Sequence, residues 1–275
     1  MGVLDGKAAI VTGSARGIGR ATAELLAEHG ARVLINDLDG DVAEQAASEI
    51  RGDTAVFAGD LTAEGVADQL VQKAVDEFGQ LDIVVNNAGY TWDGPIHKMS
   101  DEQFQAMLDI HNVVPFRVLR AAAPHLREPA KQEREEGVEN FRKIVNISSV
   151  SGTMGNAGQA NYASGKSGVV GLTKTLAKEW GQFKINVNAV AFGFVETRLT
   201  AAKEDSETIE RGGQRVQLGI PKQLRDMGKA LIPLGRAATP EEAAGGVFFL
   251  CSPWSNFVHG QVLNVTGGQF TGMGM

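Results

Sequence analysis

The hydrophobic residues of the chain follow two alternating periods. Short apolar runs predict buried strands, and the segments between them carry apolar residues at helical spacing, as at Ile18, Ala21 and Leu25. Strands are predicted at 7–12, 32–36, 54–58, 81–85, 143–147, 185–191 and 262–265. Helices are predicted at 17–29, 41–51, 62–78, 101–126 with a bend near Pro115, 160–180, and 241–250 after Thr239-Pro240.

This alternation indicates the fold class. Strands that are apolar throughout and separated by helices are typical of a parallel sheet covered on both faces. No linker rich in proline, glycine or serine divides the chain, and no shift in composition does so either. We therefore expect residues 1–275 to form a single α/β domain with a doubly wound sheet.

Two segments interrupt the alternation. Residues 127–143 are densely charged, and we interpret this charged insertion as a solvated helical extension or surface loop rather than a binding tail. Residues 198–233 mix charges, glycines and scattered apolar residues. A connection of this length in a compact domain is usually a lid or binding loop, so this segment is predicted to be a substrate lid.

Composition and charge exclude several functions. The 275 residues carry 26 lysines and arginines against 33 acids, a net charge of −7, which disfavours binding to nucleic acid or to an anionic membrane surface. The single cysteine, Cys251, excludes an intramolecular disulfide and a cysteine-based zinc site, and no metal site is predicted. Residues 1–7 lack the features of a signal peptide, and no apolar run approaches the ~18 residues of a spanning helix. These features predict a cytoplasmic protein.

A glycine-rich loop follows the first strand. Gly13, Gly17 and Gly19 have the spacing Gly-x-x-x-Gly-x-Gly and lead directly into the first helix. We expect Gly13 to allow a tight turn with positive φ, Gly19 to permit close backbone approach, and Gly17 to let helix and strand pack. The N-terminus of the helix offers unpaired N–H groups and partial positive charge to a pyrophosphate. The context of strand, loop and helix therefore predicts a dinucleotide site.

An acid ends the second strand. Asp37 lies 18 residues after Gly19, where a carboxylate accepts hydrogen bonds from ribose hydroxyls. It would also repel a 2′-phosphate, and Asp39 adds to this repulsion, whereas Arg16 could pair with that phosphate. Two acids against one arginine favour NAD(H), with NADP(H) as the alternative.

Three polar residues point to acid–base chemistry. Tyr162 and Lys166 are four residues apart on a predicted helix and share one face. An adjacent ammonium lowers the pKa of a tyrosine from its usual value of about 10. Ser149 follows the fifth strand, and the carboxyl ends of such strands open onto the ligand crevice, where its hydroxyl could hold a substrate carbonyl oxygen.

In order and spacing, these features resemble the motifs of the short-chain dehydrogenase/reductase family over residues 7–268. The matching motifs are Thr12-Gly13-x-x-x-Gly17-x-Gly19, Asn86-Asn87-Ala88-Gly89, Ser149 and Tyr162-x-x-x-Lys166. The resemblance implies a seven-stranded Rossmann sheet, hydride transfer between nicotinamide C4 and a substrate carbonyl carbon, and a homotetramer. The family usually has Pro-Gly where this chain has Phe192-Gly193, which leaves the loop under the nicotinamide less constrained.

The resemblance also implies roles for individual residues. Tyr162 would protonate the carbonyl oxygen and Ser149 would polarise it. Lys166 would lower the pKa of Tyr162 and bind the nicotinamide ribose, and Asn112 would anchor a water molecule that extends the proton relay. The predicted cofactor contacts are Gly13, Ser14, Arg16, Gly17, Ile18, Gly19, Asp37, Asp60, Leu61, Asn87, Ala88, Gly89, Tyr162, Lys166, Val195 and Thr197.

Two further segments suggest the substrate. Residues 152–162 and 191–197 are similar to those of 3-oxoacyl-(acyl-carrier-protein) reductases. The resemblance implies reduction of a 3-oxoacyl thioester, carried by acyl-carrier protein or coenzyme A, to a 3-hydroxyacyl thioester. One alternative is a dehydrogenase of another secondary alcohol, such as a sugar, steroid or small alcohol. Another is a non-catalytic NAD-binding scaffold, against which the intact Ser149, Tyr162 and Lys166 argue.

The predicted lid carries seven cations. They are interpreted either as a docking patch for an acidic carrier protein or as ordinary surface charges, and the sequence leaves both open. These residues are Arg198, Lys203, Arg211, Arg215, Lys222, Arg225 and Lys229.

Overall fold

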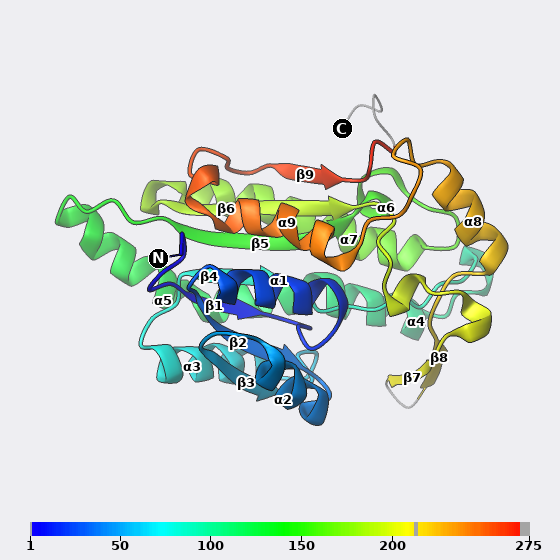
Figure 1. The fold of residues 1–275 in the computed structure, drawn as a ribbon, viewed down its shortest axis with the longest axis horizontal. Helices are drawn as coiled ribbons and strands as arrows, with labels where there is room; N and C mark the ends of the chain where they lie inside the picture. The colour runs from blue at the N-terminus through cyan, green and yellow to red at the C-terminus, as the bar shows by residue number, and fades with distance from the viewer. Residues whose placement is uncertain (1, 212–213, 270–275) are drawn as a thin grey trace.

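A parallel sheet of seven strands forms the centre of the molecule, in the order β3-β2-β1-β4-β5-β6-β9 (Figure 1). The strands are β1 (Ala8–Val11), β2 (Arg32–Asp37), β3 (Thr54–Ala58), β4 (Ile83–Asn86), β5 (Arg142–Ser149), β6 (Ile185–Phe192) and β9 (Val262–Val265). This computed structural model describes residues 2–211 and 214–269. Residues 212–213 of the predicted lid, and residues 1 and 270–275 of the predicted domain, lie outside the described residues. The predicted α/β class and seven-stranded parallel sheet are confirmed.

The strand order creates a crevice. β1 pairs with β2 on one side and with β4 on the other, so the chain moves outward through β2 and β3 and then crosses back to β4. In such sheets, ligands bind outside the carboxyl ends of the strands at the point where the order reverses. The residues that follow β1, β2 and β4 therefore surround one crevice.

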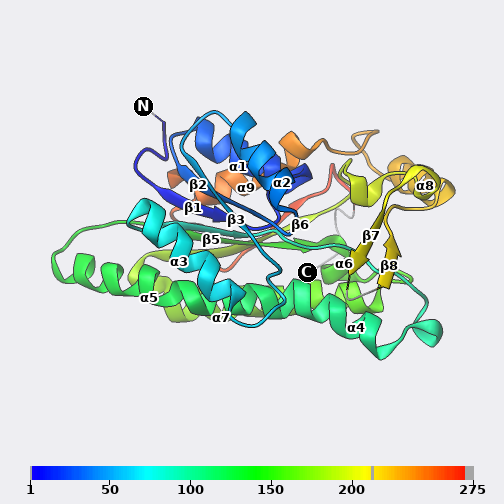
Figure 2. The same cartoon turned by 90° about the horizontal axis from the view of Figure 1, so that it is seen from below.

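Helices cover both faces of the sheet (Figure 2). One face packs against α1 (Gly17–Glu28), α2 (Gly40–Glu49) and α9 (Pro240–Cys251), and the other against α3 (Val66–Phe78), α5 (Val114–Glu135) and α7 (Ala160–Trp180). The start of α9 is fixed by a capping box, in which Thr239 Oγ1 accepts the N–H of Glu242 at 3.3 Å and the Glu242 carboxylate accepts the N–H of Thr239 at 2.9 Å. None of the helices in the described ranges has the length and apolar character needed to cross a membrane.

The helix predicted at 101–126 is instead divided and longer. It consists of α4 (Asp101–Leu108), a π-helical turn (Asp109–Val113) and α5, which continues to Glu135. Pro115 lies at the start of α5, directly after the π-helical turn. The buried side chains of Leu126 and Ala130 extend the apolar face of α5 into the charged insertion. The predicted end at 126 is therefore wrong, because packing stabilises the helix beyond its regular pattern.

The predicted lid segment contains structure that the pattern did not indicate. It holds short 3₁₀ turns at Arg198–Thr200 and Lys203–Asp205, the antiparallel hairpin of β7 (Thr208–Arg211) and β8 (Gln214–Gln217), and α8 (Lys222–Ala230). Figures 1 and 2 show these elements beyond the carboxyl ends of the sheet, on the same side as α4 and the short helix α6 (Val150–Met154). The segment is thus placed next to the crevice.

Candidate active site

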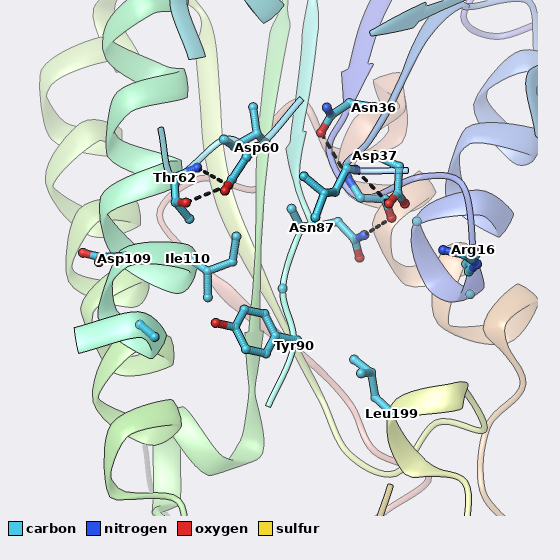
Figure 3. Close-up of a pocket in the computed structure, with 18 of the residues that line it drawn as sticks. Arg16, Asn36, Asp37, Asp60, Thr62, Asn87, Tyr90, Asp109, Ile110 and Leu199 are labelled. Carbon is cyan, nitrogen blue, oxygen red and sulfur yellow. Dashed lines mark hydrogen bonds between the residues drawn. The ribbon is translucent and has the colours of Figure 1, made fainter. Parts of the chain in front are cut away.

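A cleft of about 640 Å³ opens at the carboxyl ends of β1, β2 and β4. Figure 3 shows Arg16, Asp37 and Asn87 on one side of it and Tyr90 and Ile110 on another. The predicted cofactor contacts that line the cleft are Gly13, Arg16, Gly17, Ile18, Gly19, Asp37, Asp60, Leu61, Asn87, Ala88, Gly89 and Thr197. The cleft is large enough for a dinucleotide-sized ligand to lie along it.

Four predicted contacts do not line this cleft: Tyr162 and Lys166, which lie in a second cluster at the end of β5, and Ser14 and Val195. The Ser14 side chain is fully buried, where its hydroxyl donates to Val11 O at 2.7 Å and accepts the N–H of Asn36 at 3.0 Å. Val195 is also buried, in a bridge to Ala238. Both residues therefore support the loops behind the cleft.

Several lining residues were not predicted. They include Asn36, Leu38, Thr62, Ile110 and Leu199. Leu38 and Thr62 stand next to or near the acids Asp37 and Asp60. Their positions beside predicted contacts in the sequence are thus the feature that could have identified these lining residues. Tyr90, which directly follows the Asn86–Gly89 motif, lines the crevice as its position in the sequence suggests.

The three loop glycines have different physical roles. Gly13 has φ +61°, and a Cβ there would lie 2.8 Å from Ala88 Cα. Gly17 has φ +56°, but its added Cβ would have only ordinary contacts. A Cβ on Gly19 would lie 2.2 Å from Gly13 O and 2.4 Å from Asn87 Nδ2. The expected roles are thus partly wrong: Gly17 is needed for its backbone conformation, and Gly19 for the close packing of α1 against the loop.

A Gly19→Ala substitution is expected to weaken NADH binding by about tenfold or more. The added methyl group would push apart the loop and Asn87, whose Nδ2 donates to both Thr12 O and Gly13 O at 3.0 Å. Fluorescence titration with NADH measures the effect. Gly245→Ala is the matched control, since Gly245 lies on a helix with nothing within 4 Å of an added Cβ. Equal affinity in Gly19→Ala and wild type would contradict this account of the loop.

Charged groups surround the end of β2. The Asp37 carboxylate accepts the backbone N–H groups of Leu38 at 2.9 Å and Ala15 at 3.4 Å, which fix it at the cleft wall. The Arg16 guanidinium lies 3.2 Å from Asp39 in a partly exposed ion pair. The one loop cation is therefore already engaged by an acid.

The second polar cluster lies at the end of β5. Ser149 Oγ accepts the N–H of Ser151 at 3.1 Å and caps α6, and the Ser149 side chain acts on the Tyr162 phenol to lower its pKa. Lys166 Nζ donates to Ile147 O at 2.7 Å and lies 5.7 Å from the centroid of the Tyr162 ring. The structure therefore brings Ser149, Tyr162 and Lys166 together.

The first turn of α7 is anchored by a buried amide. Asn161 Nδ2 donates to Trp92 O at 2.9 Å and to Gln103 O at 3.0 Å, while its Oδ1 accepts the N–H of Tyr162 at 2.8 Å. These bonds connect α7 to α4 and to the loop after β4. The backbone that carries Tyr162 is thus held from two directions.

The pKa values of the pair correct one expectation. Burial raises the pKa of Tyr162 to about 12, against the hydrogen bond from Ser149, and burial lowers the pKa of Lys166 to about 7. The lowering of the pKa of Tyr162 by Lys166 that the spacing predicted is not found, because burial disfavours the charged phenolate and the nearby Asp93 carboxylate disfavours it further. The phenol therefore carries its proton at neutral pH.

The π-helical turn places His111, and not Asn112, beside Tyr162. The imidazole and phenol rings are 4.8 Å apart at 85°, whereas the Asn112 amide lies over Gly168, where an added Cβ would be 2.6 Å from Nδ2. A π turn accommodates one extra residue, which changes the side chain that faces the neighbouring helix. His111 therefore occupies the position beside Tyr162 that was expected for Asn112. Its place directly before Asn112 in the sequence is the feature that could have identified it.

Comparisons with known proteins agree with this architecture. A family model described as "Enoyl-(Acyl carrier protein) reductase" matches residues 13–269. The chain is 38% identical over 271 residues to a 3-oxoacyl-[acyl-carrier-protein] reductase FabG of Aquifex aeolicus, covering 97% of this chain and 98% of the relative. It is 36% identical over 268 residues to the Thermotoga maritima FabG, with 96% and 98% covered. A crystal structure of a dehydrogenase/reductase from Sinorhizobium meliloti 1021 is similar, with a TM-score of 0.82, 28% identity, and 97% and 96% covered.

Proposed function

The chain belongs to the short-chain dehydrogenase/reductase family, and from this premise we propose that it reduces the ketone of a 3-oxoacyl thioester to a 3-hydroxyacyl thioester. The observation that carries the proposal is the contact of Ser149 with Tyr162 beside a dinucleotide-sized cleft. The curated relatives named as 3-oxoacyl-[acyl-carrier-protein] reductases, similar over nearly the whole chain, support this substrate class.

Each residue of the cluster has a separate role in the reduction. When bound, a nicotinamide cofactor supplies the hydride for the carbonyl carbon. The Ser149 hydroxyl donates a hydrogen bond to the carbonyl oxygen, and Tyr162 transfers its proton to the same oxygen as negative charge develops there. Because the Ser149 side chain lies near enough to lower the pKa of the Tyr162 phenol, one substrate oxygen can reach both hydroxyls. The Lys166 ammonium then stabilises the phenolate that remains.

The cofactor that the cleft fits best is NAD(H). Asp37 presents negative charge at the cleft wall, where a 2′-phosphate would lie, and Arg16 is paired with Asp39. We expect Asp37→Asn to lower the preference for NADH over NADPH, as the ratio of kcat/KM values, by about tenfold, which corresponds to about 1.4 kcal/mol. Steady-state assays with both cofactors measure the ratio.

A nearby acid provides the control for this change. Asp41→Asn removes the same charge four residues away, at an exposed position outside the cleft, and should leave the ratio unchanged. A wild-type enzyme that prefers NADPH, or an unchanged ratio in Asp37→Asn, would contradict the assignment.

The lid is proposed to select the acyl group. Arg225 of α8 donates to Thr200 O at 3.1 Å, which connects the two ends of the segment, and Leu199 lines the cleft. Three of its cations are already paired: Arg198 with Glu207, and Arg225 and Lys229 with Glu196. For these three, the structure favours the interpretation as surface charges over a docking patch. The single domain and the homotetramer stay predictions.

The substrate class is tested by direct assay. Oxidation of NADH and NADPH is measured with acetoacetyl-CoA and with longer 3-oxoacyl thioesters on coenzyme A and on acyl-carrier protein. We expect turnover of 3-oxoacyl thioesters and none of the corresponding 2-enoyl thioesters, because the two hydroxyls are arranged for an oxygen on the carbon that accepts the hydride, and C3 of a 2-enoyl thioester carries no oxygen. Absence of turnover with every 3-oxoacyl thioester would overturn the proposed function and favour another secondary alcohol as substrate.

A further inference from the structure

The buried His111 lies at the centre of the catalytic cluster, yet the mechanism above does not use it. Its side chain, 2% exposed, extends from the π-helical turn between α4 and α5. The ring meets the Tyr162 ring almost perpendicularly, at 4.8 Å and 85°, the edge-to-face arrangement that aromatic pairs favour. The imidazole thus forms one wall of the space that holds the phenol.

Two glycines make room for this ring. An added Cβ on Gly89 would lie 2.4 Å from His111 Cε1, and one on Gly165 would lie 2.9 Å from His111 Cβ. Gly89 follows β4 and lines the cleft, whereas Gly165 lies on α7 between Tyr162 and Lys166. The histidine is therefore fitted between the cofactor loop and the catalytic helix.

A backbone contact fixes the state of the ring. His111 Nε2 lies 2.7 Å from Tyr90 O, and since a carbonyl only accepts, Nε2 carries the hydrogen. Nδ1 is buried and has no hydrogen-bond partner among the residues described. Burial and the nearby Lys166 charge lower the pKa of His111 well below its usual value. The imidazole is thus held as the neutral Nε2–H tautomer, which leaves Lys166 as the cation beside the phenol.

We propose that His111 is a positioning residue for Tyr162, a neutral imidazole that is locked by Tyr90 O and holds the phenol hydroxyl toward Ser149 and the substrate oxygen. This role rests on the proposed function, in which Tyr162 donates the proton. Small displacements of a reacting group can lower a rate by about 100-fold, so a fixed wall beside the ring matters for kcat more than for binding. An unpaired buried nitrogen such as His111 Nδ1 lowers the stability of the fold. A role in positioning Tyr162 explains why a histidine is nevertheless present beside the phenol.

Three substitutions separate the two contacts of the ring. His111→Leu removes both contacts, His111→Phe keeps a ring against Tyr162, and His111→Gln keeps a donor toward Tyr90 O. We expect His111→Leu to lower kcat by about tenfold or more, with NADH affinity within about twofold of wild type and a larger solvent isotope effect on kcat. Both other variants should recover part of the loss. Active sites are counted by NADH titration, so a fraction of misfolded protein does not enter kcat.

A second histidine whose ring bonds to a backbone carbonyl supplies the control. His259 Nε2 lies 2.6 Å from Ala177 O, toward the far end of α7. His259→Leu should lower stability while kcat and the solvent isotope effect stay at wild-type values. A wild-type kcat in His111→Leu, or a lower kcat with an unchanged isotope effect, would overturn the positioning role. If the wild-type enzyme reduces other ketones but no 3-oxoacyl thioester, only the proposed substrate is overturned, and the His111 variants are then compared with those ketones. If the wild-type enzyme reduces no ketone, both the proposed function and the positioning role of His111 are overturned.

Discussion

Tyr162→Phe is expected to lower kcat for thioester reduction by about 1,000-fold while leaving the NADH dissociation constant within about twofold of wild type. The phenylalanine ring keeps the contacts with His111 and with the Lys166 ammonium but removes the proton. Ser149 cannot replace it, because the proton of a serine hydroxyl is far less acidic than that of a phenol. Single-turnover kinetics with NADH and a 3-oxoacyl thioester measure the loss, and titration by fluorescence measures binding.

The matched control for this loss is on the same helix. Ser164→Ala also removes one hydroxyl from α7, two residues away, where Ser164 is exposed and bonded only to Ala160 O among the hydrogen bonds described. We expect wild-type kcat in that variant. A Tyr162→Phe enzyme that retains more than about a tenth of wild-type kcat would show that the proton comes from another source.

Replacing Lys166 by methionine is expected to lower kcat by about 100-fold and, at the same time, to stabilise the fold near neutral pH. The ammonium lies 5.7 Å from the centroid of the phenol ring, so its loss removes a charge that stabilises the phenolate. Its burial is costly, since burial lowers the pKa of Lys166 to about 7 from 10.5. An apolar side chain of similar length avoids that cost.

The sign of the pH dependence follows from these two pKa values. Between about pH 7 and 10.5 the unfolded chain binds more protons at Lys166 than the folded chain, so this group makes stability rise with pH in that window. Below pH 7 both states are charged and the full burial cost remains. Denaturation in urea at several pH values should therefore show a smaller rise in the free energy of unfolding for Lys166→Met than for wild type.

Lys174 on the exposed side of α7 gives the comparison for this substitution. Lys174→Met should leave both kcat and the pH dependence of stability unchanged. Equal pH dependence in Lys166→Met and wild type would mean that Lys166 keeps its ordinary pKa in the folded protein.

The sequence predicted most of the fold because its sheet strands are short runs rich in apolar residues. The bounds of β3, β9 and α7 match the predicted ranges, and the other strands differ by one to two residues at an end. The same pattern failed at the π-helical turn, where one extra residue changes the facing side chain without breaking the apolar period. It failed also at α8 and the β7–β8 hairpin, which are short and lie in a segment that mixes charges, glycines and scattered apolar residues.

The sequence predicted which residues form the candidate site better than it predicted their pKa values and packing. Spacing alone brought Tyr162 and Lys166 to one helix face, and the glycine loop and Asp37 to one cleft. Spacing carries no measure of desolvation, so the direction of the pKa change of Tyr162 was missed. The roles of Gly17 and Gly19 depend on φ and on the position of Asn87, which come from contacts between distant segments. Contacts of this kind also placed His111, and not Asn112, at the phenol.

The fate of the cofactor hydride tests the central claim most directly. The wild-type enzyme is supplied with NADH that carries deuterium on the transferred position of nicotinamide C4, together with a 3-oxoacyl thioester, and the product is analysed by mass spectrometry and NMR. The account predicts a 3-hydroxyacyl thioester with one deuterium on C3, and no such product from Tyr162→Phe under the same conditions. NADH oxidation without deuterium on C3, or an unreacted thioester, would contradict it.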